Sequence, residues 1–132
     1  MMALIRGSRN ESTEMALARL LRAAKITGWR RHQGVIGKPD FVFNKEKVAV
    51  FVDGCFWHGC PKHFKAPKSR VDFWKTKITG NIRRDRRVNA GLRKLGWMVI
   101  RIWEHDLTRS LAMRAVVRIK KAVDSRRIGL RS

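Results

Sequence analysis

The five residues from Val48 to Val52 are apolar at every position, Val-Ala-Val-Phe-Val. An unbroken apolar run of this length predicts a strand covered on both faces, because a strand with one solvated face alternates apolar and polar side chains. A shorter run, Phe41-Val42-Phe43, lies just upstream, and the polar residues Asn44-Lys45-Glu46 between the two runs predict an antiparallel hairpin. The strand therefore requires a fold in which helices cover both faces of a sheet.

Helical and strand patterns continue on both sides of this hairpin. One apolar stripe at helical spacing follows Ser12 or Thr13, either of which can cap a helix: Leu17, Leu20, Leu21 and Ala24. Residues 29–33 predict a short strand, 71–95 a helix that Gly80 is able to break, 97–103 a further strand and 111–123 a last helix. This order predicts an α/β fold with a mixed β-sheet flanked by helices. One domain over residues 12–125 is expected between a flexible basic arm (1–11) and a basic tail (126–132).

The chain carries a large excess of positive charge, with 31 Lys and Arg against 10 Asp and Glu and a net charge of +21. Such an excess repels itself in a compact state, so a polyanionic partner is expected. Nucleic acid is favoured, because each phosphate contact releases condensed counterions; a ribonucleoprotein component and a binder of anionic membranes are the alternatives. No apolar run reaches the roughly 18 residues of a membrane span, and the N-terminus lacks a signal-peptide pattern. We expect a cytoplasmic, reducing location.

Acidic residues are few, so the position of two of them is informative. Asp40 opens the first strand of the predicted hairpin and Asp53 closes the second, which brings both toward one end of the sheet. Paired carboxylates suit Mg²⁺, a hard cation that prefers oxygen ligands. The same spacing also fits a turn residue after Pro39 and a simple strand terminator, and it does not discriminate between the two interpretations.

Thiols and imidazoles gather in the loop after this strand. Cys55, Cys60 and His63 supply three ligands, one short of the tetrahedral set of a structural zinc. His105, just past the next strand, is the natural fourth ligand, and His58 competes with it. The alternative is an ordinary loop with two free thiols; a disulfide is disfavoured in a reducing compartment.

His58 and three aromatic residues have further chemical interpretations. An imidazole beside the carboxylate pair is suited to take a proton from an attacking water, and Asp85 could orient it. The alternative for Asp85 is a salt bridge with its arginine neighbours. Phe56, Trp57 and Trp74 lie in or beside a polar, basic segment, where exposed rings can stack on bases or wedge between base pairs. Core packing is the alternative for each ring.

Taken together, these motifs resemble those of the very-short-patch-repair DNA mismatch endonucleases. The resemblance covers roughly residues 6–120 and rests on five segments: Pro39-Asp40-Phe41-Val42, Val52-Asp53-Gly54-Cys55-Phe56-Trp57-His58, Asp72-Phe73-Trp74, Asn81-x3-Asp85-Arg86-Arg87 and Leu95-Gly96-Trp97-x5-Trp103-Glu104. It implies a restriction-endonuclease-like core with a zinc-stapled loop, which nicks one strand of double-stranded DNA with Mg²⁺. A monomer is adequate for such a nick.

The resemblance also implies roles for individual residues. Asp40 is similar to the principal magnesium ligand, aided by the backbone carbonyl of Val52. His58 resembles the general base, Asp85 the residue that holds it, and Glu14 a supporting acid. The implied structural zinc ligands are Cys55, Cys60, His63 and His105, and the implied wedge beside a T:G mismatch is Phe56, Trp57 and Trp74.

Two residues depart from the family pattern. Position 53 is Asp where the mismatch-specific members carry His, so Asp53 is a candidate second metal ligand. Cys55 stands where restriction enzymes have a Lys, which leaves His58 with a larger share of the chemistry. We expect a Mg²⁺-dependent DNA endonuclease acting at or near a T:G mismatch. The alternatives are a homing- or restriction-type nicking enzyme with the same core, and a non-catalytic zinc-containing DNA-binding module.

Overall fold

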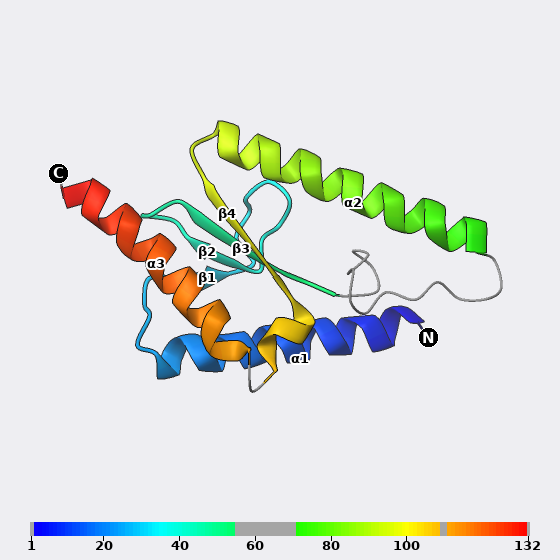
Figure 1. Ribbon diagram of the computed structural model, residues 1–132, viewed down its shortest axis with the longest axis horizontal. Helices are drawn as coiled ribbons and strands as arrows, with labels where there is room; N and C mark the ends of the chain where they lie inside the picture. Colours follow the sequence, from blue (N-terminus) through cyan, green and yellow to red (C-terminus); the bar gives the residue numbers. More distant parts are fainter. Residues whose placement is uncertain (1, 55–70, 109–110, 132) are drawn as a thin grey trace.

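The computed structural model describes residues 2–54, 71–108 and 111–131, and among them the side chains of 13–54, 72–108 and 111–129 (Figure 1). The elements in chain order are α1 (Met2–Ala23), β1 (Arg30–Arg31), β2 (Phe41–Phe43), β3 (Val48–Asp53), α2 (Val71–Lys94), β4 (Met98–Trp103), the 3-10 helix η1 (Glu104–Leu107) and α3 (Ala112–Arg131). No helix in these ranges is both long enough and apolar enough to span a membrane. The fold is mixed α/β, as the sequence predicts.

The four strands form one mixed sheet in the order β1-β2-β3-β4. β1 and β3 each pair antiparallel with β2, whereas β4 runs parallel to β3. The predicted hairpin between β2 and β3 is confirmed, with Phe41 opposite Val50. Because a parallel neighbour needs a crossover, α2 carries the chain from the end of β3 back to the start of β4 (Figure 1).

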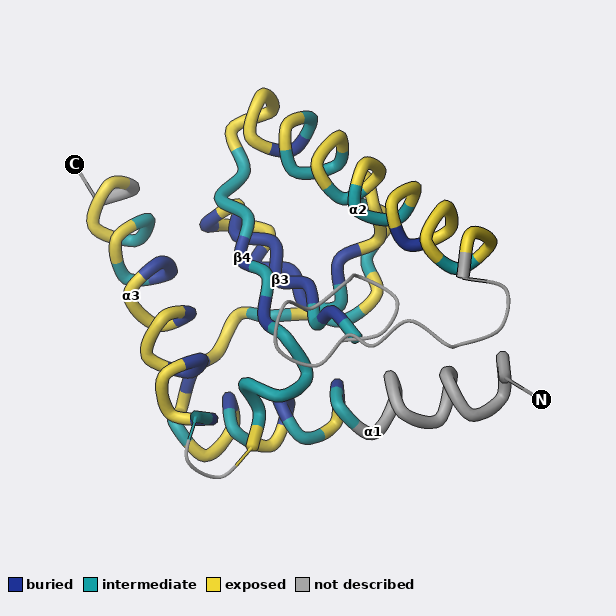
Figure 2. Tube along the Cα trace, turned by 45° about the vertical axis from the view of Figure 1, so that its right-hand side comes forward, coloured by how far each residue is buried: buried dark blue, intermediate teal, exposed yellow. Residues whose placement is uncertain are grey.

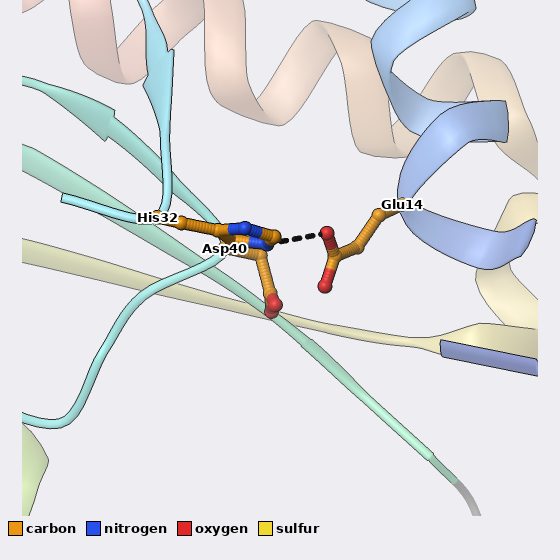
Figure 3. A group of neighbouring side chains, drawn as sticks. All are labelled: Glu14, His32 and Asp40. Atoms are coloured by element: carbon orange, nitrogen blue, oxygen red, sulfur yellow. Dashed lines mark hydrogen bonds and ion pairs between the residues drawn. The ribbon is translucent and has the colours of Figure 1, made fainter. Parts of the chain in front are cut away.

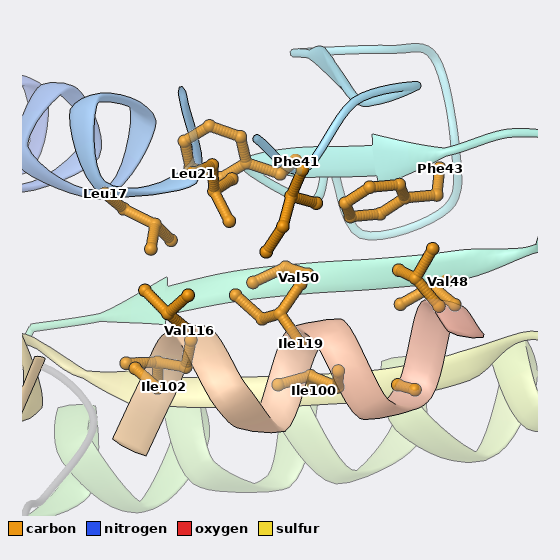
Figure 4. Packing of buried hydrophobic residues seen from close by; sticks show 14 of the residues in the cluster. Leu17, Leu21, Phe41, Phe43, Val48, Val50, Ile100, Ile102, Val116 and Ile119 are labelled. Atoms are coloured by element: carbon orange, nitrogen blue, oxygen red, sulfur yellow. The ribbon is translucent and has the colours of Figure 1, made fainter. Parts of the chain in front are cut away.

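Two helices cover one face of the sheet. Leu17 and Leu21 of α1 and Val116 and Ile119 of α3 pack against apolar side chains of the strands, as Figure 4 shows. The strand residues in this cluster are Phe41, Phe43, Val48, Val50, Ile100 and Ile102. The predicted apolar stripe is therefore confirmed as the core-facing side of α1, and the predicted last helix packs beside it as α3.

Helix α2 covers the opposite face. Leu92 of α2 is fully buried against Ala49 and Phe51, the β3 residues that alternate with the first cluster. The two clusters explain why the predicted strand is apolar at successive positions. The outer side of α2 is exposed along its length (Figure 2), so this helix has one face packed toward the sheet and one solvated face.

The start of one helix, the continuity of a second and the end of a third differ from the sequence-based expectations. Helix α1 begins at Met2, so residues 2–11 are helical rather than an irregular arm; Leu, Arg, Met and Glu there favour helix. Helix α2 continues through Gly80, because one glycine costs only about 1 kcal/mol in a helix. Helix α3 extends to Arg131, through the expected tail. The Arg127 guanidinium contacts Glu46 and donates to the Thr27 carbonyl, which anchors that end.

Candidate active site

Glu14, His32 and Asp40 come together at one end of the sheet. They come from α1, from the residue after β1 and from the residue before β2. Each offers one potential ligand atom, and these three atoms all lie within 4.8 Å of one another (Figure 3). Among the described residues, no other trio of acidic, histidine or cysteine side chains is drawn together in this way. The arrangement can hold one metal ion.

Glu14 is largely enclosed, with 10% of its side chain exposed. Its Oε2 atom accepts a hydrogen bond from Arg31 Nη2 at 2.6 Å and lies 2.7 Å from His32 Nε2. Burial acts to raise the pKa of Glu14, but the hydrogen bonds with Asp40, Arg31 and His32 outweigh it, and the pKa lies below its usual value. Glu14 is therefore held in its ionised form.

Asp40 is fixed by the hairpin. Its Oδ2 atom accepts a hydrogen bond of 2.6 Å from the Val52 backbone N–H, and its own N–H donates to the Val50 carbonyl at 2.9 Å. Burial, followed by the hydrogen bond with Glu14, raises the pKa of Asp40 from 3.8 to about 7, although the Val52 N–H acts in the opposite direction. Two neighbouring carboxyl groups thus differ in protonation, as expected when one proton is shared between them.

His32 was not predicted as a site residue from the sequence. It adopts a positive φ of 52°, which ends β1 and turns the chain. Arg31 pairs with Phe41, so His32 and Asp40 are the next positions in that register, although no strand continues to them. Knowledge of that two-residue pairing would have identified His32. From the sequence alone, His32 is one of four histidines in the chain, and it lies at the end of a short strand with a weak pattern.

Arg101 of β4 organises a second polar cluster, on the face of the sheet covered by α2. Its Nη1 atom lies 3.0 and 3.2 Å from the two carboxylate oxygens of Asp53 and 3.6 Å from Asp85 Oδ1. Its Nε atom donates to Asn89 Oδ1 at 2.7 Å, and the guanidinium lies over the Phe51 ring at 4.0 Å. Asp53 is therefore held by a guanidinium and lies outside the Glu14–His32–Asp40 group.

Other predicted site residues have defined surroundings or lie outside the described residues. His105 lies in η1, where its Nε2 atom is 3.2 Å from Asp106 Oδ1 and its ring is stacked 6.5 Å from Trp103. Trp74 is half-buried on α2 and meets Phe73 edge-on at 5.2 Å. Outside the described residues lie Cys55, Phe56, Trp57, His58, Cys60 and His63.

The exposed side of α2 is basic. Gly80, Arg83, Arg86 and Arg87 line one shallow depression there, and a second depression shares Gly80 and Arg83. The second is completed by Lys75, Thr76 and Thr79. We call this surface the α2 basic face. Its spacing, with cations three and four residues apart, directs several positive charges to the same side of the helix.

Comparison with known proteins provides independent information on this arrangement. Residues 1–64 match the family model described as DNA mismatch endonuclease Vsr. Over 107 residues the chain is 41% identical to the type II nicking enzyme V.NmeDIP of Neisseria meningitidis serogroup C. The matched region covers 78% of this chain and 71% of that protein.

Two further relatives have similar descriptions. Over 77 residues the chain is 51% identical to the type II nicking enzyme V.NaeI of Lentzea aerocolonigenes, covering 58% of this chain but only 46% of that relative. It is 38% identical over 98 residues to DNA mismatch endonuclease Vsr of Escherichia coli (strain K12), covering 74% of this chain and 63% of that protein.

Proposed function

We propose a specific DNA-nicking reaction for this chain, which belongs to the DNA mismatch endonuclease Vsr family. Membership makes it a DNA endonuclease. The finer proposal is that it hydrolyses one strand of duplex DNA at or near a T:G mismatch, using Mg²⁺ on a restriction-endonuclease-like core. The observation that carries the proposal is the convergence of Glu14, His32 and Asp40 at the end of a strand hairpin.

The donor atoms at this site fit the metal. Glu14 and Asp40 offer carboxylate oxygens, the ligand type that Mg²⁺ prefers, and the exposed His32 leaves the site in contact with solvent, which can supply the waters that Mg²⁺ retains. When bound, such an ion polarises a phosphoryl oxygen and offsets the charge that develops on the phosphate. Asp40 would hold it, with Glu14 in support. Asp53 is a further candidate, although Arg101 Nη1 already contacts both of its carboxylate oxygens.

Proton transfer is assigned by resemblance to His58, with Asp85 as the residue that orients it. The structure supports half of this pair: Asp85 lies on the inner side of α2, within 3.6 Å of Arg101, which also binds Asp53 at the end of β3. Asp85 is thus directed toward the strand from which the His58 segment continues. A histidine there would accept a proton from the attacking water at neutral pH.

The α2 basic face is proposed to contact the DNA backbone. Replacing Arg83 and Arg87 with Gln should weaken duplex binding and reduce the slope of log affinity against log salt concentration by up to about 1.8, since each phosphate contact contributes about 0.9. Binding titrations at several salt concentrations measure this. Replacing Arg114 and Lys121 on α3 removes the same charge and serves as the control. Equal losses in the two double variants would exclude a specific role for α2.

A structural zinc remains part of the proposal. Asp53 and Trp103 are register partners in the parallel pair β3–β4, so Cys55 and His105 each follow a partnered residue by two positions. With Cys60 and His63 they would complete the tetrahedral set of thiolates and imidazoles that a structural zinc requires. Elemental analysis of the purified protein should find one zinc per chain. A protein that nicks DNA without zinc would eliminate this part of the proposal.

Cleavage of matched duplexes tests the function as a whole. One duplex carries a T:G mismatch, the other is fully paired in the same sequence, and each is incubated with and without Mg²⁺. We expect a single nick in the mismatched duplex, and only when Mg²⁺ is present. Equal nicking of paired DNA would indicate a sequence-specific nicking enzyme. Binding without any nicking would indicate a non-catalytic DNA-binding module.

A further inference from the structure

We propose that His32 is a third protein ligand of the catalytic metal ion and that it makes the site bind Mn²⁺ in preference to Mg²⁺. This inference rests on the metal site of the proposed function. Its basis is geometric, because the imidazole Nε2 atom lies 2.7 Å from Glu14 Oε2 and within 4.8 Å of the Asp40 ligand atom. An ion that contacts both carboxylates is therefore within reach of the imidazole.

The chemistry of the donor set gives the preference. Two carboxylates alone form an oxygen site, which suits Mg²⁺. Imidazole suits Fe, Ni, Cu and Zn best, whereas Mn²⁺ shares with Mg²⁺ a preference for carboxylate oxygens. Of these two oxygen-preferring ions, Mn²⁺ is the transition metal and accepts one nitrogen ligand more readily than Mg²⁺ does. His32 thus converts an oxygen site into a mixed nitrogen and oxygen site.

The surroundings of His32 allow this role. Its side chain is 61% exposed, whereas that of Glu14 is 10% exposed, so an ion can enter from the solvent side past the imidazole. Its backbone is held at φ 52° after β1, which fixes the origin of the side chain close to Asp40. Arg31 Nη2 also binds Glu14 Oε2, so the site carries one guanidinium beside its two carboxyl groups. The positive charge of Arg31 lowers the affinity of the site for a cation, and a third protein ligand raises that affinity again.

A simpler role for His32 is to orient Glu14 by their hydrogen bond. His32→Gln separates the two roles, because a Gln amide can keep a hydrogen bond to Glu14 but lacks the imidazole. Since His32 is exposed, the variant should fold, and its thermal unfolding and circular dichroism are compared with those of the unaltered protein.

Metal affinity is measured by calorimetry with Mn²⁺ and with Mg²⁺ on the zinc-loaded protein. In His32→Gln, we expect Mn²⁺ affinity to fall about tenfold or more and Mg²⁺ affinity to change by less than about threefold. Pulsed electron paramagnetic resonance of bound Mn²⁺ should detect coupling to an imidazole nitrogen that the variant lacks. Unchanged Mn²⁺ affinity, parallel losses for both metals, or a nitrogen coupling that persists in the variant would overturn the role of His32.

The outcome for the proposed function is read separately. If the unaltered protein nicks DNA with Mg²⁺ but His32→Gln binds Mn²⁺ normally, only the inference about His32 fails. If the unaltered protein binds neither metal and does not nick DNA, the proposed function fails and the His32 inference fails with it. Asp40→Asn serves as the reference variant and should weaken binding of both metals.

Discussion

Replacing Asp40 with Asn is expected to reduce nicking at least about 10³-fold, equivalent to about 4 kcal/mol of transition-state stabilisation. Asp40 contributes one of the two carboxylates that fit the metal, and an amide is a weaker ligand without charge. Asn can still accept the hydrogen bond from the Val52 N–H, so the hairpin should remain intact. Single-turnover nicking of a T:G duplex at saturating protein measures the effect. If the variant nicks at the normal rate, Asp40 is not an active-site residue.

The same substitution should stabilise the protein in buffer without Mg²⁺ at alkaline pH. Burial raises the pKa of Asp40 from 3.8 to about 7, so the folded state holds this proton more tightly than the unfolded chain. Ionisation of Asp40 therefore opposes folding: the cost is absent below pH 4, grows between pH 4 and 7 and is complete above pH 7. We expect Asp40→Asn to raise the free energy of unfolding by about 1–3 kcal/mol at pH 8 and by little at pH 4.5.

Glu14→Gln provides the control of opposite sign. Despite its burial, hydrogen bonds hold the pKa of Glu14 below its usual value, so its ionised form supports folding above the unfolded-state pKa. This variant should lose stability at pH 8 and lose less as the pH falls. Urea unfolding of both variants at pH 4.5 and 8 tests the pair. The interpretation fails if the two substitutions change stability in the same direction at pH 8.

Local patterns were sufficient to predict the centre of the fold. The apolar run at Val48–Val52 predicted a strand covered on both faces, and both faces of β3 are buried. Periodicity could not locate the ends of α1 and α3. The end of α3 depends on a tertiary anchor, the contact between Arg127 and Glu46, which are 81 residues apart.

Only part of the candidate site could be predicted, because some of its contacts also join residues that are far apart in the sequence. Asp40 was identified from its place in the hairpin and Glu14 from the family resemblance, and the structure brings the two together. His32 was missed because its proximity to Asp40 depends on a strand pairing of only two residues. Asp53 was expected near the metal from hairpin geometry, and its charge contributes to the raised pKa of Asp40. Hairpin geometry does not, however, specify side-chain partners. Its partner Arg101 lies 48 residues away on a parallel strand and has no local sequence signal.

Replacing Arg101 with Met should cause the largest loss of stability, about 3–5 kcal/mol, which is typical when one partner of a buried ion pair is removed. Asp53 is only 5% exposed, and Arg101 contributes two short contacts to its carboxylate. The substitution also removes the hydrogen bond to Asn89 and the ion pair with Asp85. The Met side chain can still pack on Phe51, so the loss is mainly electrostatic. Urea unfolding at pH 7 measures the change.

A double-mutant cycle with Asp53→Asn separates this charge effect from lost packing. If the buried carboxylate is the reason for the loss, Arg101→Met should cost less in the Asp53→Asn background than in the unaltered protein, by at least about 1 kcal/mol. Additive losses would mean that Arg101 acts through packing or through Asp85 and Asn89. The cycle also bears on the metal. If Asp53→Asn leaves Mg²⁺ affinity unchanged, Asp53 is not a metal ligand and serves only as the partner of Arg101. A large loss of affinity would instead support Asp53 as a second metal ligand.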